Sequence, residues 1–526
     1  MAHQNPAPFV YLDAAAAADA RRRGTDPHVL EQSTQDVLKY IYTCLPNAPV
    51  YTRAALSALP ASSGDADDRI SALPFGILRN IVSRLPAKDA ARTAALSRRW
   101  RPVSRCTPLA LADAHHLPGL LEGRLRHPAR ADTPALAATV SRAVAAHPGP
   151  SRAVHLVCGY YADAARQRDL ARWFQTFAAK GVAELVLVNR PWPLDVPLPA
   201  ALLEVATLTR LYLGLWKFPG TSALPHPNRG AAAVFPHLRE LVLCSMEVES
   251  RDMEYLLAGS PVLENLGIVG ARKNVTHLRL VGQHLRCVQI CLSAIDSVAV
   301  VDTPSLERLF LWETMVLDGS CARLRIGKAP KLRVLGYLNP GIHMLEIRNT
   351  VINAGIKASP STMVPGIKIL GLNVRFGVRN DVKMLPTFLR CFPNVETLHF
   401  VSQKTEVVDG KVNLKFWQEA GPIGSIQSCI KMMTFREFRM ERSEVAFLKF
   451  FFQSAQVLNN AVIVVSNGSF TSIREVMSKL KTLIPENGPT QSCRVLVYES
   501  SDLDGGALWR LQKGFDFSVS DPLYYR

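Results

Sequence analysis

A short apolar phrase returns along this chain and constrains its fold more than any other feature. In each copy an apolar residue is followed by two variable residues, a second apolar residue, one variable residue and a third apolar residue. Such recurrence indicates stacked units that bury their apolar sides against one another, so the sequence predicts a solenoid. The copies are Leu208-Leu211-Leu213, Leu238-Leu241-Leu243, Leu263-Leu266-Ile268, Leu285-Val288-Ile290, Leu306-Leu309-Leu311, Leu332-Leu335-Tyr337, Ile367-Leu370-Leu372 and Val395-Leu398-Phe400.

The spacing of the copies is typical of leucine-rich repeats. Their starts lie 30, 25, 22, 21, 26, 35 and 28 residues apart, against roughly 20–29 residues in such repeats. Ile342-Leu345-Ile347 is a further copy inside the longest interval. We therefore predict an α/β fold with a leucine-rich-repeat solenoid, a curved parallel sheet, over residues 151–355. Its convex side is expected to hold helices at 164–179 and 252–257, and short strands at 278–280, 298–301 and 324–326.

The pattern changes towards the C-terminus, where apolar helices and strands alternate. Residues 461–526 are predicted to form an α/β cap that covers the last edge of the sheet, because an uncovered edge invites aggregation. The expected elements are a helix at 445–457, a strand at 462–465, a helix at 473–483 and a strand at 495–498.

A compact helical segment occupies residues 67–106. Ile77, Leu78, Ile81 and Leu85 form an apolar stripe that ends at Pro86. Roughly forty residues rarely bury enough apolar surface to be stable alone, so we expect this segment to give its apolar face to a partner. The flanking parts are predicted to be an extension with one helix (27–45) and a linker over 1–66, and an Ala- and Pro-rich connector with one short helix (136–146) over 107–150.

The residue order of this segment closely resembles a plant F-box. The resemblance covers the whole segment and departs from the pattern only at the small pair Ala94-Ala95. It implies a subunit that docks on the Skp adaptor of a ubiquitin ligase and, through it, on a cullin and a RING subunit. The matching stretches are Asp68-Arg69-Ile70-Ser71-Ala72-Leu73-Pro74, Ile77-Leu78, Ile81, Ser83-Arg84-Leu85-Pro86, Lys88-Asp89-Ala90-Ala91-Arg92 and Leu96-Ser97-Arg98-Arg99-Trp100-Arg101.

Carried over by position, the resemblance implies a role for each apolar residue. Leu73 and Pro74 would enter an apolar pocket on the adaptor, and Leu96 and Trp100 would help to hold the segment together. The remaining adaptor-binding positions are Ile77, Leu78, Ile81, Leu85 and Pro86. Basic residues would face an acidic adaptor and raise the association rate; they are Arg84, Lys88, Arg92, Arg98, Arg99 and Arg101.

A second resemblance, over residues 356–460, is to the FBD region of plant F-box proteins. It implies a continuation of the solenoid and brings no chemistry of its own. The stretches that carry it are Ser359-Pro360-Ser361-Thr362-Met363-Val364, Val374-Arg375-Phe376, Leu385-Pro386, Leu389-Arg390-Cys391-Phe392-Pro393-Asn394-Val395-Glu396-Thr397-Leu398 and Phe435-Arg436-Glu437-Phe438.

Patterns that indicate catalysis or a cofactor are absent from the sequence. It has no G-x-S-x-G, P-loop or H-E-x-x-H motif, and its ten cysteines include no C-x-x-C pair, so we expect no enzyme activity, cofactor or metal site. No segment approaches the roughly 18 apolar residues that span a bilayer. We therefore expect a soluble protein of the nucleus or cytoplasm, without a membrane partner.

The target protein is expected on the concave sheet. Residues that alternate with the inward leucines of each strand face outward there. Arginine and aromatic side chains are typical of binding hot spots, and Phe310 with Trp312 on one strand suits an occupied face. Cover by convex loops, or a register shifted by one residue, are the alternatives. The predicted target-binding residues are Arg210, Tyr212, Arg279, Gln289, Arg308, Phe310, Trp312 and Arg348.

The leading interpretation is a substrate-recognition adaptor that holds a target near activated ubiquitin. The net charge of +17 would also suit a nuclear, nucleic-acid-associated scaffold, although the basic residues are scattered and no aromatic-interleaved basic cluster occurs. An F-box protein that acts outside ubiquitin transfer is a further alternative. The concave face could in addition hold a small-molecule co-ligand, as in some plant F-box receptors.

Overall fold

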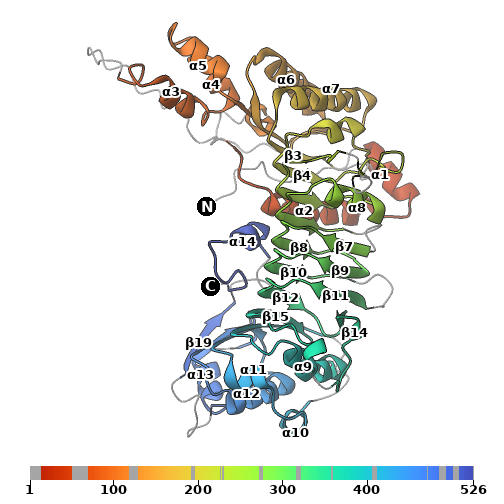
Figure 1. The fold of residues 1–526 in the computed structure, drawn as a ribbon, viewed down its shortest axis with the longest axis vertical. Coiled ribbons are helices and arrows are strands. Elements are labelled where there is room, and N and C mark those ends of the chain that lie inside the picture. Colours follow the sequence, from red (N-terminus) through yellow and green to blue (C-terminus); the bar gives the residue numbers. More distant parts are fainter. Residues whose placement is uncertain are drawn as a thin grey trace. The chain divides into compact units, whose positions relative to one another are not determined.

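Parallel strands follow one another through the middle of this protein and alternate with helices towards the C-terminus, as Figure 1 shows for the computed structural model. The chain divides into two compact units, Met1–Asn274 and Val275–Arg526. The structure describes residues 14–49, 69–117, 128–190, 196–225, 227, 230, 232–271, 277–315, 321–356, 359–405, 412–470, 472–484, 493–500 and 509–524.

The first unit is built on six parallel strands that follow one another in chain order. Leu211, Leu241 and Leu266 lie side by side in neighbouring strands and are fully buried, as the repeated phrase predicts. The strands are β1 (Leu109–Ala112), β2 (Ser151–Leu156), β3 (Glu184–Val188), β4 (Arg210–Gly214), β5 (Glu240–Cys244) and β6 (Asn265–Val269).

Helices connect and flank these strands. Those predicted at 164–179 and 252–257 are confirmed as α7 (Ala164–Lys180) and α8 (Ser250–Ala258). The others are α1 (Ala14–Arg22), α2 (Pro27–Cys44), α3 (Phe75–Val82), α4 (Ala87–Thr93), α5 (Trp100–Cys106) and α6 (Thr133–Ala146).

Two predictions for this unit are wrong. The N-terminal extension holds two helices, α1 and α2, because the alanine run at residues 14–18 is itself a strong helix former. The connector at 107–150 carries the first strand of the sheet, β1, whose four buried residues pair with β2. A strand this short left too weak a pattern among the alanines and prolines to be recognised.

Helix α2 is fixed to the sheet of the first unit at its C-terminal end. Asp26 caps its start by accepting a hydrogen bond from the His28 amide, and Pro27 suits the first helical position. The buried Tyr42 hydroxyl donates to the carbonyl of Val157 at 2.7 Å, and Arg190 donates to the same hydroxyl at 2.8 Å. Helix α2 is therefore an integral part of this unit.

The second unit contains a sheet of eight parallel strands, called here the main sheet. Val288, Leu309, Leu335, Leu370 and Leu398 lie in register and are fully buried, which again follows the repeated phrase. In spatial order the strands are β8 (Cys287–Cys291), β10 (Arg308–Trp312), β12 (Val334–Leu338), β15 (Ile369–Val374), β16 (Thr397–Ser402), β17 (Met432–Phe438), β18 (Asn460–Val465) and β19 (Arg494–Glu499).

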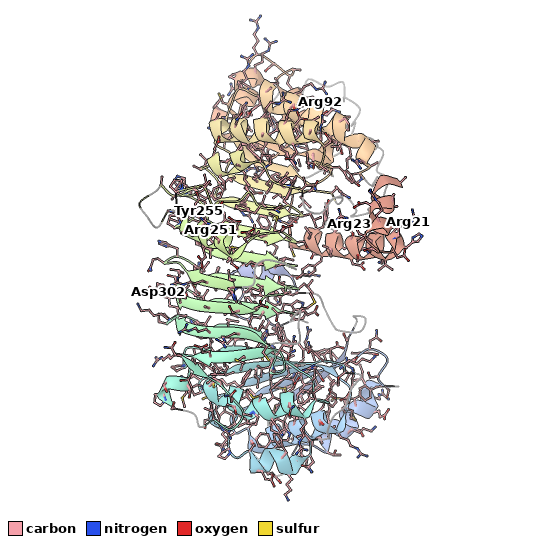
Figure 2. The ribbon with its side chains drawn as sticks, turned by 90° about the vertical axis from the view of Figure 1, so that its right-hand side faces the viewer. Arg21, Arg23, Arg92, Arg251, Tyr255 and Asp302 are labelled. Carbon is pink, nitrogen blue, oxygen red and sulfur yellow. The ribbon has the colours of Figure 1, made fainter. Side chains whose placement is uncertain are left out.

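A second sheet of five strands lies beside β8, β10 and β12, to their right in Figure 1. Three of its strands were predicted as convex strands and are confirmed; Asp302, at the end of one of them, is labelled in Figure 2. The sheet consists of β7 (His277–Val281), β9 (Ser297–Asp302), β11 (Ala322–Lys328), β13 (His343–Ile347) and the short antiparallel β14 (Thr350–Val351).

Three details of the second unit differ from expectation. The copy Ile342-Leu345-Ile347 lies in β13 of the five-stranded sheet, not in the main sheet. The register shifts after Leu335, so that Leu338 takes the place predicted for Tyr337. Strands β18 and β19 prolong the main sheet instead of covering its edge, because parallel pairing continues through both.

Helices of the second unit cluster around β15 to β19 (Figure 1). An aromatic core holds them: Trp417 is fully buried and contacts Phe447 and Phe450, at 5.0 and 5.4 Å between ring centroids. These helices are α9 (Arg379–Cys391), α10 (Leu414–Glu419), α11 (Gly424–Ser428), α12 (Arg442–Ser454) and α13 (Ile473–Lys481), and α14 (Leu511–Phe515) lies apart from them.

Candidate functional site

Residues 70–106 form a three-helix module, α3 to α5, with a very small core. Leu78 and Val82 of α3 pack against Trp100 and Val103 of α5, and Leu73 leans on this cluster. Hydrogen bonds tie the segment before α3 to α5: the Trp100 indole donates to the Ser71 hydroxyl at 2.8 Å, and Arg99 donates to the Leu73 carbonyl at 2.7 Å. The module is thus ordered, although it buries few side chains.

Large apolar side chains lie exposed on the outside of this module. Five of the twelve such side chains in the described part of the chain belong to it. A soluble protein rarely leaves apolar groups concentrated in this way unless another molecule covers them. The five are Ile70, Phe75, Ile77, Ile81 and Leu96, with exposed fractions of 57%, 46%, 50%, 38% and 67%.

The predicted adaptor-binding residues divide between this surface and the core. Pro74 is exposed with Ile77, Ile81 and Leu96, while Leu73, Leu85 and Pro86 are half-buried. Leu78 and Trp100 are buried. Ile70 and Phe75 were missed, although Phe75 follows Pro74 directly in the first helical turn.

Two implied roles change as a result. Leu78 was expected to contact the adaptor, but it lies in the core with Val82, four residues further along the same helix face. Leu96 was expected to hold the module together, but it lies beyond the end of α4 and is exposed.

The module is also strongly basic. Residues 69–106 contain nine Lys or Arg and a single acidic residue, Asp89. Asp89 forms an ion pair with Arg92 at 3.2 Å; Arg92 is labelled in Figure 2. The basic charge of the chain is therefore less scattered than the sequence analysis held. All six basic residues named there are exposed: Arg84, Lys88, Arg92, Arg98, Arg99 and Arg101.

Two leucines of the module are expected to respond differently to truncation. Leu78→Ala removes a core side chain, which should cost about 3 kcal/mol and speed amide exchange in residues 70–106 roughly a hundredfold. Leu96→Ala, at an exposed position, should change stability by less than about 0.5 kcal/mol. Hydrogen exchange followed by mass spectrometry measures both, and equal effects would contradict the core described above.

The predicted target-binding face of the main sheet is partly covered by the chain itself. Residues 509–524, called here the C-terminal segment, lie across β8, β10 and β12 on the side away from β7, β9 and β11 (Figure 1). Phe310 and Trp312 are buried, and Trp509 lies 4.8 and 6.2 Å from their ring centroids. The expectation that these two rings are open to solvent is wrong.

Gln289 and Arg308 are buried beneath the same segment. The Gln289 amide donates to the Leu511 carbonyl at 2.9 Å, and its oxygen accepts from the Trp509 indole at 2.7 Å. Arg308 donates to the carbonyls of Gly514, Asp516 and Val519 at 2.8, 3.0 and 2.6 Å. Both residues point to the predicted side of the sheet, but neither is exposed.

An ion pair anchors the far end of the C-terminal segment. His399 of β16 lies 2.9 Å from the Asp521 carboxylate. Burial alone would raise the pKa of Asp521, but the hydrogen bond and charge of His399 outweigh it and hold that pKa below its usual range. The negative charge of Asp521 is therefore kept at neutral pH.

Arg210 and Tyr212 belong to a polar network in the first unit. Arg210 bridges Glu184 and Glu240 at 3.1 and 2.7 Å, and the Tyr212 hydroxyl donates to Glu240 at 2.5 Å. Tyr212 is fully buried and is closed to a partner, whereas 36% of the Arg210 side chain remains exposed.

Arg279 and Arg348 do not lie on the main sheet. Arg279 is exposed on β7, and Arg348 is exposed in the turn after β13. Both therefore belong to the five-stranded sheet. Strands β7 and β13 carry the same apolar pattern as strands of the main sheet but form a different sheet. The predicted placement of Arg279 and Arg348 on the concave face is therefore wrong.

Within the described ranges no group of three or more His, Cys, Asp or Glu is arranged to hold a metal ion. Across the same residues, no helix is both long and apolar enough to cross a membrane. The exposed surface of the module and the covered face of β8, β10 and β12 carry apolar or aromatic side chains together with basic groups. Such side chains are typical of protein-binding surfaces.

Family models match three parts of the chain. The F-box domain matches residues 70–106, the leucine-rich repeats of "FBD-associated F-box protein At5g56370" match residues 170–400, and FBD matches residues 418–463. The F-box match coincides with the three-helix module.

Relatives from Arabidopsis thaliana carry names that combine F-box and LRR-repeat, in one case with FBD. "F-box/LRR-repeat protein At3g59200" is 31% identical over 38% of this chain and 36% of its own length. "F-box/LRR-repeat protein At3g26922" is 26% identical over 52% and 76%, and "F-box/FBD/LRR-repeat protein At1g51370" is 25% identical over 63% and 73%. The match thus spans only about a third of the first relative's length.

Proposed function

Because the chain is a plant-type F-box protein with leucine-rich repeats and an FBD region, we propose that it is the substrate-recognition adaptor of a Skp–cullin–F-box ubiquitin ligase. In this role it works inside the cell without bond chemistry of its own. The module binds a Skp-family adaptor, which brings a cullin and a RING subunit, and the repeats hold a target protein.

The observation that carries this proposal is the exposed apolar surface of the module. Ile77 and Ile81 are four residues apart on α3 and so lie on one side of the helix, and Phe75 lies in its first turn. The core residues Leu78 and Val82 occupy the adjacent side. Since the module already has a core, its outward residues are available to a second protein.

The charge of the module supports the same partner. Residues 69–106 carry eight net positive charges in addition to the exposed apolar residues. These basic groups would steer an acidic protein towards the module and raise the association rate, while the apolar residues supply most of the affinity. A polyanion such as nucleic acid would gain nothing from the exposed isoleucines.

A binding measurement with purified Skp adaptor tests the proposal. Ile81→Ser should weaken adaptor binding about tenfold, because the exposed Ile81 side chain would lose roughly 1.4 kcal/mol of apolar burial in the complex. Ile473→Ser on α13 is the matched control, since Ile473 has an exposed fraction of 40% against 38% for Ile81. Isothermal titration calorimetry gives both affinities.

Absence of binding by the unmodified chain, or equal loss from both serine variants, would exclude this use of the module. If the adaptor binds but a reconstituted ligase transfers no ubiquitin to any captured protein, the alternative of an F-box protein outside ubiquitin transfer takes its place.

A further inference from the structure

The C-terminal segment lies on the main sheet in the way that a bound peptide lies on a receptor. It contacts β8, β10, β12, β15 and β16. Side chains of these strands bind its backbone and several of its side chains. It does not pair as a strand with any of them. The leucines of the repeats fill the opposite side of the sheet, so the repeat core is built without this segment.

Two apolar anchors fix the segment. Trp509 is fully buried against Phe310, Trp312 and Tyr337. Leu523 lies over two glycines, Gly336 of β12 and Gly371 of β15; a Cβ on either would come within 3.0 Å of its Cδ1. The absence of side chains at these two glycines thus leaves room for the Leu523 side chain.

Polar side chains of the sheet form hydrogen bonds with the backbone between the two anchors. Arg308 donates to three main-chain carbonyls of the segment, and Gln289 donates to a fourth. Any peptide backbone of this course offers such carbonyls, whatever its side chains. The segment approaches Gln289 so closely, however, that position 514 requires glycine. A Cβ there would lie 2.3 Å from the Gln289 Oε1 atom.

Charge and ring contacts complete the recognition. The guanidinium groups of Arg286 and Arg308 lie 3.7 and 4.6 Å from the centre of the Phe517 ring. His399 binds Asp521 twelve positions after Trp509. Together these contacts define a ligand: an indole, a small residue, an aromatic ring and then a carboxylate and a leucine.

We propose that this face is the peptide-binding groove for the target, and that the C-terminal segment is its resident ligand. A target enters by displacing that segment, and it carries an exposed stretch with the same order of groups. This inference rests on the proposed function in one respect, that the repeats hold the target. It needs no adaptor and can fail independently.

An exchange experiment tests the proposal on the full chain. A specific protease site is placed within residues 501–508, the chain is cut, and a fluorescent peptide of residues 509–526 is added. Fluorescence anisotropy should report saturable binding to the cut chain, at least tenfold weaker in Arg308→Gln, which loses three hydrogen bonds from a charged donor. Arg279→Gln, on the five-stranded sheet, is the control and should bind unchanged.

Peptide variants test whether binding depends on the sequence of the peptide. A Gly514→Leu peptide should not compete, because its side chain would collide with Gln289, whereas a Ser520→Ala peptide should compete fully, since Ser520 is exposed. Circular dichroism follows the fold throughout.

If the cut chain unfolds, or stays folded but neither loses its segment nor binds the labelled peptide, the segment is a fixed part of the fold and the proposal is overturned. Adaptor binding by the module is measured on the same sample and distinguishes this failure from failure of the proposed function.

Discussion

Phe75→Asp combined with Ile77→Asp is expected to lower affinity for the Skp adaptor by about a thousandfold or more. Both side chains lie exposed on the module, at 46% and 50%, and would be buried on binding. Each substitution removes apolar contact and forces a carboxylate out of water, at roughly 2 kcal/mol or more apiece. Calorimetric titration of the adaptor into the double variant measures the loss.

The matched control carries the same two charges elsewhere. Leu224→Asp with Ile473→Asp also places carboxylates on half-exposed apolar positions, at 39% and 40%, outside the module. Its adaptor affinity should equal that of the unmodified chain. A double Asp variant of the module that keeps native hydrogen exchange and still binds tightly would show that the adaptor does not use this surface.

Trp417→Ala is expected to cause the largest loss of stability in the second unit. The indole is fully buried among Phe416, Phe447 and Phe450, and no small side chain can fill the cavity that remains. The cost should be about 4 kcal/mol, equivalent to a fall of about 10 °C in the midpoint of thermal unfolding of this unit. Differential scanning calorimetry measures the midpoint.

The neighbouring residue provides the comparison. Phe416 contacts the same indole at 5.2 Å but is only half-buried, so Phe416→Ala should lower the midpoint by less than half as much. Similar shifts from both variants would mean that the aromatic core around Trp417 is less tightly packed than its burial indicates.

Sequence reasoning succeeded where a local pattern imposes a side-chain direction. The leucines at 211, 241 and 266 must all point inward if the units stack, and the apolar residues at 278–280, 298–301 and 324–326 predicted three strands of the five-stranded sheet. Such signals lie within a few residues of one another. The module was likewise recognised because its residue order is compact and specific.

Contacts between distant parts of the chain could not be found in this way. Trp509 reaches Gln289 across 220 positions, and Asp521 reaches His399 across 122. Strands β8 and β10 therefore appeared to have a free side. A tryptophan and two phenylalanines in the last eighteen residues were a signal that the terminus is buried, but they did not reveal where.

The wrong prediction for Leu78 inside the module has a different cause. Successive residues of a helix differ by about 100° in direction, so Leu78 and Ile77 face different surroundings although they are neighbours in sequence. Membership of one apolar stripe did not decide which of them lies in the core. That decision depends on where α5 packs, which only the folded module specifies.

Strands β8, β10 and β12 have every residue buried, because repeat leucines fill one side and the C-terminal segment contacts the other. A new side chain at Gln289 or Arg308 must therefore be matched by a change in residues 509–524, or the two surfaces no longer fit. Over evolutionary time, these strands and residues 509–524 are expected to be inherited and altered as a pair. A change of specificity at this face would then need two linked mutations far apart in the coding sequence.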